Sequence, residues 1–113
     1  MADRPRILLV EDDVLIGMML ADMFDALGLP EPAQAASKDE ALAIIAAEPL
    51  DGALVDINLG EEKGWPVADA LAERDIPFAF TSGGGDILPA AHAHRRLVGK
   101  PFRISDIEAA LAE

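Results

Sequence analysis

Cysteine is absent from this chain of 113 residues, and no apolar run is long enough to cross a membrane. Without cysteine there can be no disulfide framework, thiolate metal site or thiol nucleophile. The first residues, MADRPRI, lead into a strand-like run and lack the apolar core of a signal peptide. We therefore expect a cytoplasmic protein that does not bind a membrane.

Basic residues are also scarce. Nine lysines and arginines stand against 21 aspartates and glutamates, which gives a net charge of −12. Binding to a nucleic-acid backbone requires a cationic surface, and the only compact basic cluster in the sequence is the run HAHRR at 92–96. Direct nucleic-acid binding is therefore not expected. The acidity suits a protein that binds cations or basic partners, although solubility alone explains much of it.

Short apolar runs alternate with amphipathic stretches five times along the chain. Four of the runs are strongly apolar and one is weaker. In chain order, with the weaker run second, they cover residues 6–10, 32–36, 52–57, 77–81 and 95–99. Runs of this kind are typical of parallel strands that are covered on both faces. The alternation predicts a single α/β domain with a parallel sheet.

The first predicted helix follows the first apolar run. Residues 16–27 place apolar side chains on one helical face, and Gly28 is expected to end the helix. Met19 and Met23 belong to this face. At helical spacing they are predicted to pack in the core rather than to form a binding surface.

Three further helices have recognisable starts. Ser37 with Glu40, and Ser105 with Glu108, have the spacing of capping boxes, in which each side chain bonds the other residue's main-chain amide. Residues 64–74 carry apolar side chains on one face and form the third predicted helix. The helices at Ser37 and at 64–74 fill intervals between the apolar runs, and the helix at Ser105 follows the last run, as an α/β fold requires.

The stretch GGGDILPAAHAH, at 83–94, is an exception among the intervals. Its three glycines and Pro89 make any helix there short or frayed. His92 and His94 lie in this stretch. We expect both to be solvated on an exposed helix rather than to bind a metal or carry a phosphoryl group.

Three consecutive carboxylates, Glu11, Asp12 and Asp13, directly follow the first apolar run. Asp56 lies at the end of the third run, and ligands of an open parallel sheet bind beyond the carboxyl ends of its strands. If the two strands are neighbours, the carboxylates converge and repel one another. A hard divalent cation relieves this repulsion, and all-oxygen ligands favour Mg²⁺ over zinc. The sequence therefore predicts a magnesium site.

Two further polar residues are expected at the same edge of the sheet. Thr81 ends the fourth run and Lys100 follows the fifth. A cation beside a carboxylate, with a hydroxyl and an ammonium group nearby, can catalyse phosphoryl transfer. Aspartate is a known covalent nucleophile toward phosphorus, and we predict that Asp56 accepts the phosphoryl group.

The motifs ILLVEDD, LVDINLG, FTSG and GKPF occur in this order and resemble the receiver domain of two-component response regulators, over residues 6–112. The resemblance implies a doubly wound, flavodoxin-like sheet of five strands in the order 2-1-3-4-5. It also implies that a sensor histidine kinase, or a phosphotransfer protein, supplies the phosphoryl group and that a downstream protein reads the conformational change. We expect one such domain at 1–113 without an output domain, and homodimer formation stays open.

The resemblance also assigns metal ligands. Asp12 and Asp56 would bind Mg²⁺ directly, Glu11 would help through a water molecule, and Asn58 would contribute its main-chain carbonyl. A receiver of this kind catalyses its own phosphorylation and dephosphorylation at Asp56. It is therefore not an enzyme that turns over an external substrate.

Thr81 and Lys100 would contact the phosphoryl group, and the Lys100–Pro101 peptide is expected to be cis. The chain departs from the family pattern at two positions near them. Gly60 stands where the family usually has proline. Leu97 stands where the family usually has an aromatic side chain that responds to phosphorylation. The stretches on either side of Thr81 are also a few residues shorter than usual.

Other functions stay open at this point. A phosphohydrolase with an aspartate nucleophile uses similar groups, but it usually has a second acid where Asn58 stands. A degenerate receiver would only dock to partners. A flavin-binding module of similar fold would need a glycine-rich phosphate loop after the first strand, where residues 11–13 are acidic.

Some of the polar residues have plainer explanations. Asp13 is expected to cap the first helix, because aspartate is a preferred N-cap residue. Ser82 is expected to lie in a turn. Trp65 is expected to pack at the start of the third helix rather than to bind a ligand.

Overall fold

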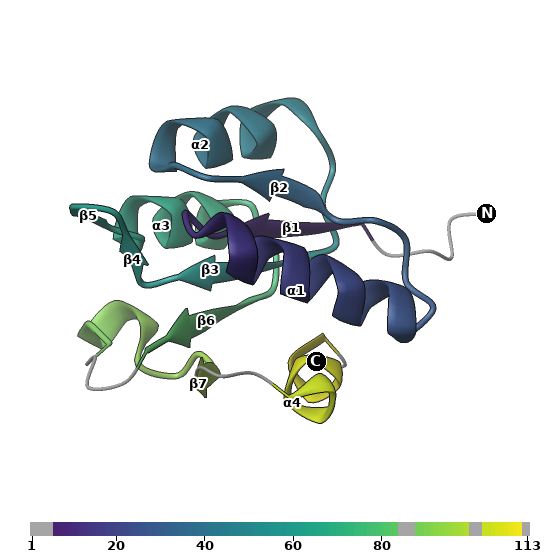
Figure 1. The fold of residues 1–113 in the computed structure, drawn as a ribbon. Helices are drawn as coiled ribbons and strands as arrows, with labels where there is room; N and C mark the ends of the chain where they lie inside the picture. The colour runs from purple at the N-terminus through teal and green to yellow at the C-terminus, as the bar shows by residue number, and fades with distance from the viewer. Residues whose placement is uncertain (1–5, 84–87, 100–102, 112–113) are drawn as a thin grey trace.

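Five parallel strands form the central sheet, in the order β2-β1-β3-β6-β7 (Figure 1). The structure is a computed structural model that describes residues 6–83, 88–99 and 103–111. The strands are β1 (Ile7–Val10), β2 (Ala33–Ala35), β3 (Gly52–Asp56), β6 (Phe78–Ser82) and β7 (Leu97–Gly99). A short antiparallel hairpin, β4 (Asn58–Leu59) with β5 (Glu62–Lys63), lies outside the sheet. Without the hairpin strands, the order is the predicted 2-1-3-4-5, and the flavodoxin-like fold is confirmed.

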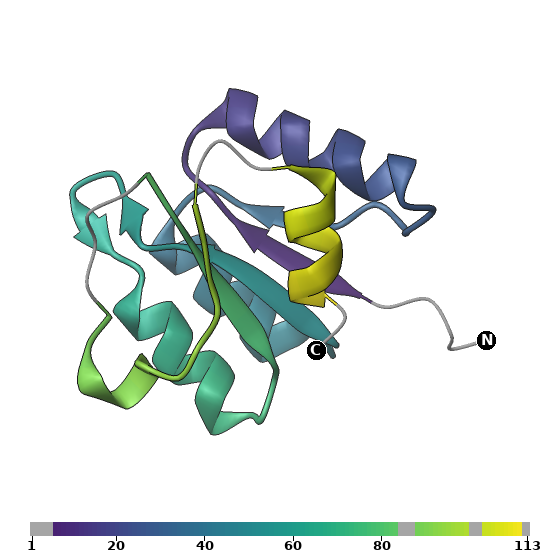
Figure 2. The ribbon, with the colours of Figure 1, turned by 90° about the horizontal axis from the view of Figure 1, so that it is seen from below.

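Helices cover both faces of this sheet (Figures 1 and 2). α1 (Val14–Ala26) and α4 (Ile104–Leu111) lie on one face, whereas α2 (Lys38–Ala47) and α3 (Trp65–Glu73) lie on the other. This arrangement is the doubly wound one that the resemblance implies. In the described ranges, no helix combines the length and the apolar character that crossing a membrane requires.

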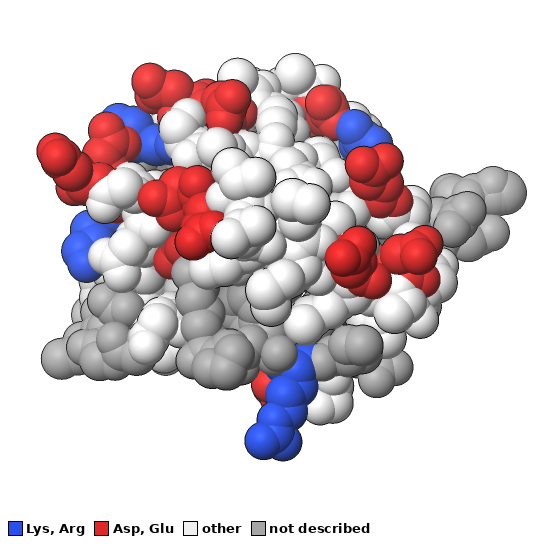
Figure 3. Space-filling view, in the orientation of Figure 1, with Lys and Arg blue, Asp and Glu red and all other residues white. Residues whose placement is uncertain are grey.

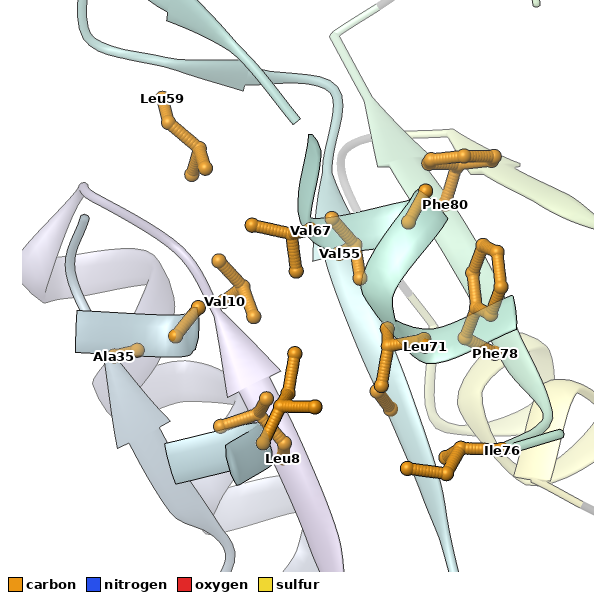
Figure 4. Close-up of a cluster of buried hydrophobic side chains, with 14 of the residues drawn as sticks. Leu8, Val10, Ala35, Val55, Leu59, Val67, Leu71, Ile76, Phe78 and Phe80 are labelled. Carbon is orange, nitrogen blue, oxygen red and sulfur yellow. The ribbon is translucent and has the colours of Figure 1, made fainter. Parts of the chain in front are cut away.

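The sheet separates two apolar cores, because successive residues of a strand point to opposite faces. Leu8 and Val10 of β1 pack on the side of α2 and α3, together with Phe78 and Phe80 of β6 (Figure 4). Ile7, Leu9 and their neighbours pack on the side of α1 and α4. Both faces of β1 are therefore buried, which explains its uninterrupted apolar sequence.

Helix α1 begins and ends close to the predicted residues. After it, the Gly28 amide bonds the Asp25 carbonyl and the Leu29 amide bonds the Phe24 carbonyl, at 3.0 and 2.9 Å. Gly28 has a φ of +76°, so the helix ends in a Schellman motif that favours glycine. The prediction for Met19 was wrong. Its side chain is 43% exposed, because the buried stripe of α1 is formed by Gly17, Leu20 and Phe24.

At α2, half of the predicted capping box is present: Ser37 Oγ accepts a hydrogen bond from the Glu40 amide at 3.2 Å, and the helix begins at the next residue, Lys38. The Glu40 carboxylate accepts from the amide of Ala36, one residue before Ser37, at 2.7 Å. At the last helix the prediction was wrong, since Ser105 lies inside α4 rather than before it. There the Asp106 carboxylate accepts from the Arg103 amide at 3.2 Å. The helix therefore starts at Ile104, earlier than predicted, and the acid that bonds a main-chain amide before the helix is Asp106, whereas the prediction named Glu108.

The described part of the segment between β6 and β7 contains one turn of 3-10 helix, η1 (Ala90–His92). The predicted short helix is thus present, but His92 is not solvated: it is only 4% exposed. Its Nε2 lies 2.8 Å from Asp69 Oδ1 on α3, and its ring packs edge-on against Phe78 and Phe80. His94 is exposed, as expected. Trp65 packs as predicted, with its ring centroid 5.4 Å from that of Phe80.

Candidate functional site

Three carboxylates meet at the carboxyl edge of the sheet. Glu11 and Asp12 follow β1, and Asp56 is the last residue of β3, which pairs with β1. One oxygen from each side chain lies within 4.8 Å of the other two. Asp56 is 3% exposed and Glu11 7%, whereas Asp12 is open to solvent. The predicted convergence of these carboxylates is therefore present.

Each of the three carboxylates accepts a hydrogen bond from a main-chain amide. The donor–acceptor pairs are Asp13 N–H to Glu11 Oε2 at 3.1 Å, Gly60 N–H to Asp12 Oδ2 at 2.8 Å, and Asn58 N–H to Asp56 Oδ1 at 3.0 Å. Main-chain donors are fixed by the fold, so they limit the directions in which the side chains can point. The backbone of the fold thus helps to hold the three carboxylates in place.

Asp13 does not belong to this cluster. Its Oδ1 accepts hydrogen bonds from the amides of Leu15 and Ile16, at 2.9 and 3.3 Å. This is the geometry of an N-cap, and α1 begins at the following residue. The predicted capping role of Asp13 is confirmed. Two adjacent aspartates therefore do different work: Asp12 faces the cluster, and Asp13 begins the helix.

Thr81 lies beside Asp56, because the two residues are Cα partners in the β3–β6 pairing. Its side chain is buried, and its carbonyl accepts from the Ile57 amide at 3.0 Å. Ser82 is also buried and pairs with Gly99, so β6 continues one residue beyond Thr81. The prediction that Ser82 lies in a turn was wrong. Lys100 and the Lys100–Pro101 peptide lie outside the described residues.

The loop after Asp56 folds back onto the site through the β4–β5 hairpin. Lys63 Nζ donates to the Asn58 side-chain oxygen at 2.6 Å, so the Asn58 side chain takes part in the hairpin. The predicted role of the Asn58 main-chain carbonyl as a metal ligand stays a prediction.

Gly64, at the start of α3, is a site residue that the sequence analysis missed. A Cβ atom there would lie 2.6 Å from the Asp56 carbonyl oxygen, closer than side chains normally approach. The Gly64 amide also bonds the Ile57 carbonyl at 2.7 Å. Glycine is thus required for the chain to pass behind Asp56. The signal in the sequence is its place directly before Trp65 and Pro66, where a helix begins.

The donor set of the cluster fits a hard divalent cation. All three candidate ligands are carboxylates, and neither nitrogen nor sulfur is among them. Mg²⁺ is commonly bound by one or a few carboxylates while it keeps several water molecules. Acidic side chains also outweigh basic ones over the visible face of the molecule (Figure 3), so the surroundings favour a cation over an anion.

The family model described as the response regulator receiver domain matches residues 7–112. The chain belongs to this family. Receiver domains are generally signalling modules without turnover of an external substrate, which interact with histidine kinases and downstream targets. They bind Mg²⁺ in their active site.

Several solved structures are similar to this receiver domain over nearly its whole length. The BeF3-activated conformation of SdrG from Pseudomonas melonis Fr1 is 41% identical, with a TM-score of 0.82, and the match covers 99% of this chain and 97% of that one. SdrG from Sphingomonas melonis Fr1 gives the same identity and coverage, with a TM-score of 0.84. The receiver domain of PhyR from Erythrobacter litoralis is 28% identical, with a TM-score of 0.77 and coverage of 96% and 88%. Among curated proteins, none matches this chain.

Proposed function

We propose that this protein is the phosphoacceptor of a two-component or phosphorelay system in the cytoplasm. A histidine kinase or a phosphotransfer protein would donate the phosphoryl group to Asp56, with Mg²⁺ bound beside it. The observation that carries the proposal is the meeting of Glu11, Asp12 and buried Asp56 next to Thr81. Such a site provides a nucleophile, a place for a cation and a hydroxyl within one small region.

Four residues would hold the cation. Asp12 and Asp56 would bind it directly, Glu11 through a water molecule and Asn58 through its main-chain carbonyl. When bound, Mg²⁺ offsets the negative charge that the carboxylates and the phosphoryl group bring together.

The protein's own part in the transfer is positioning. The Asn58 amide holds Asp56 Oδ1 at 3.0 Å, and burial restricts the Asp56 side chain further. As an Asp56 carboxylate oxygen forms its bond to phosphorus, the bond from phosphorus to the donor's imidazole nitrogen breaks, and that nitrogen takes up a proton. Thr81 and Lys100 would contact the equatorial oxygens. For Thr81 the proposal is supported by its position beside Asp56, and for Lys100 by the GKPF motif.

A protein donor also needs a surface on which to dock. Four large apolar side chains are exposed in the first two turns of α1, directly after the capping residue Asp13: Val14, Leu15, Met18 and Met19. Exposed apolar groups of this size are a common feature of protein interfaces. Their position supports docking of the phosphohistidine protein over the start of α1, where it can reach Asp56.

The test is incubation with a small phosphodonor and Mg²⁺, followed by intact-mass measurement and assay of released phosphate. A receiver forms a stable acyl phosphate, seen as one added phosphoryl group. Steady release of phosphate would instead favour a phosphohydrolase, and no modification would favour a degenerate receiver that only docks. The BeF3-activated conformation of SdrG supports the first outcome, because that relative is 41% identical.

A further inference from the structure

We propose that Gly60 is a positioning residue for Asp12, and that its main-chain N–H sets how the Asp12 carboxylate is presented to the cation. The inference rests on the proposed function, since it concerns the same cation site. It starts from a contact between residues 48 positions apart: the Gly60 amide donates to Asp12 Oδ2 at 2.8 Å.

Both parts of this contact require a residue other than proline. Gly60 has a φ of +65°, in the left-handed region, whereas the proline ring fixes φ near −65°. Proline also has no N–H to donate. The residue that the family usually has at this position could therefore not make the contact. Proline, the usual residue of the family, has no main-chain N–H here. Glycine at position 60 has one, and it donates to Asp12, a predicted metal ligand.

Asp12 needs such a contact more than its neighbours do. Glu11 and Asp56 are buried, so packing limits their rotamers, but Asp12 is exposed. An exposed aspartate samples several rotamers unless a hydrogen bond selects one. With Oδ2 held by Gly60, the contact favours monodentate binding of a cation through Oδ1. Groups that orient a metal ligand in this way commonly change metal affinity.

The donor itself is held by the hairpin that carries it. Gly60 follows β4, and its neighbour Leu59 is buried in the apolar core. Lys63 of β5 bonds Asn58 of β4 at 2.6 Å, and Glu62 lies 3.7 Å from Lys38 at the start of α2. The Gly60 amide is thus part of a structured turn, so it can hold the Asp12 carboxylate in one orientation.

The contact can be tested first in the metal-free protein, by amide hydrogen exchange. Asp12→Ala is expected to speed exchange of the Gly60 amide about tenfold, since the acceptor is removed. Asp39→Ala is the matched control, because Asp39 lines the same small pocket as Asp12 and Gly60. It removes the same charge and should leave the Gly60 rate unchanged. Equal Gly60 rates in wild type and Asp12→Ala would overturn the inference.

The consequence for the cation is tested by Mg²⁺ titration followed by NMR. Gly60→Pro is expected to weaken Mg²⁺ binding about tenfold. Gly60→Asn keeps the N–H and tolerates positive φ, so it should bind within about twofold of wild type. Replacing the Leu59–Gly60 amide by an ester removes the N–H without changing any side chain or requiring a different φ, and it decides the matter if Gly60→Pro does not fold. Wild-type affinity in the ester protein would refute the inference.

These experiments separate the inference from the proposed function. If the wild type binds no Mg²⁺, the cation site itself is refuted, and the positioning role is refuted with it. If the wild type binds Mg²⁺ and Gly60 makes no difference, only the positioning role fails.

Discussion

The carboxyl edge of β1 and β3 and the segment at 88–95 are held in place by different kinds of contact. At the edge, each carboxylate accepts a hydrogen bond from a main-chain amide within the same small region. The segment at 88–95 has main-chain hydrogen bonds within its own turn, and side chains join it to distant elements. His92 contacts Asp69 on α3, and the Arg95 guanidinium lies 4.1 Å from the centre of the Phe78 ring on β6.

The difference has a physical consequence for how each region can move. A carboxylate held by backbone donors stays in place as long as the strands and turns persist, because those donors belong to the fold. The segment depends on a few side-chain contacts, and individual contacts of this kind contribute little. We therefore expect the edge to keep its geometry and the segment to be the more easily displaced.

The largest expected effect concerns the nucleophile at the edge. Asp56→Asn should abolish the mass shift that acetyl phosphate and Mg²⁺ produce, because an amide oxygen is a far weaker nucleophile than a carboxylate. Intact-mass spectrometry measures this directly. Asp69→Asn is the control, since it makes the same change on the surface of α3 and should leave the mass shift intact. Continued modification of the Asp56→Asn protein at one site would contradict the assignment.

The next effect separates the two adjacent aspartates. Wild type should bind Mg²⁺ with a dissociation constant in the millimolar to sub-millimolar range, roughly 4–5 kcal/mol of binding free energy. Asp12→Ala should remove most of that affinity. Asp13→Ala should keep the affinity but lower the free energy of unfolding by about 1 kcal/mol, because Asp13 caps α1. Equal Mg²⁺ affinity in wild type and Asp12→Ala would place the metal elsewhere.

The contrast between the carboxyl edge and the segment at 88–95 also explains which features could be predicted from the sequence. The apolar runs and their alternation predict the parallel α/β sheet, and these are local signals. The strand order was predicted from the resemblance to the receiver family, and the meeting of Glu11, Asp12 and Asp56 follows once that order makes their strands neighbours. The hairpin of β4 and β5 was not predicted, since strands of two residues have no periodicity to detect.

Errors arose where a residue's environment depends on a distant partner. In the sequence, His92 is a polar residue in a glycine-rich stretch, which favours exposure. In the structure it is buried, because it contacts Asp69, Phe78 and Phe80. Met19 lies on the predicted apolar face of α1. The helix buries only a narrow stripe of residues on that face, however, and Met19 lies outside the stripe and is exposed. The Gly60 contact with Asp12 spans 48 positions and has no local sign.

A smaller effect concerns how phosphorylation would be transmitted. Leu97 has no ring that could respond to a movement of Thr81, and the prediction therefore turns to the segment 82–91, of which residues 84–87 lie outside the described residues. We expect a beryllofluoride phosphoryl mimic to shift the amide signals of residues 82–91. Thr81→Ala should lose these shifts, because we expect the Thr81 hydroxyl to contact the phosphoryl mimic. Shifts confined to residues that touch the mimic would contradict this prediction.

The smallest expected effect is the loss of one contact that holds the segment. Because a carboxylate only accepts, His92 Nε2 carries the hydrogen and donates it to Asp69 Oδ1. The Asp69 side chain is 65% exposed, so water replaces it easily, and Asp69→Ala should lower the free energy of unfolding by only about 1 kcal/mol.

Amide hydrogen exchange should reveal the loss of this contact more clearly than global stability does. The Arg95 amide, which bonds the His92 carbonyl at 3.0 Å, should exchange faster, while amides of β1 and β3 change little. Asp69→Asn keeps an acceptor oxygen and should retain most of the protection. If Asp69→Ala leaves Arg95 exchange unaltered, aromatic packing alone holds the segment, and the two regions differ less than their hydrogen bonds indicate.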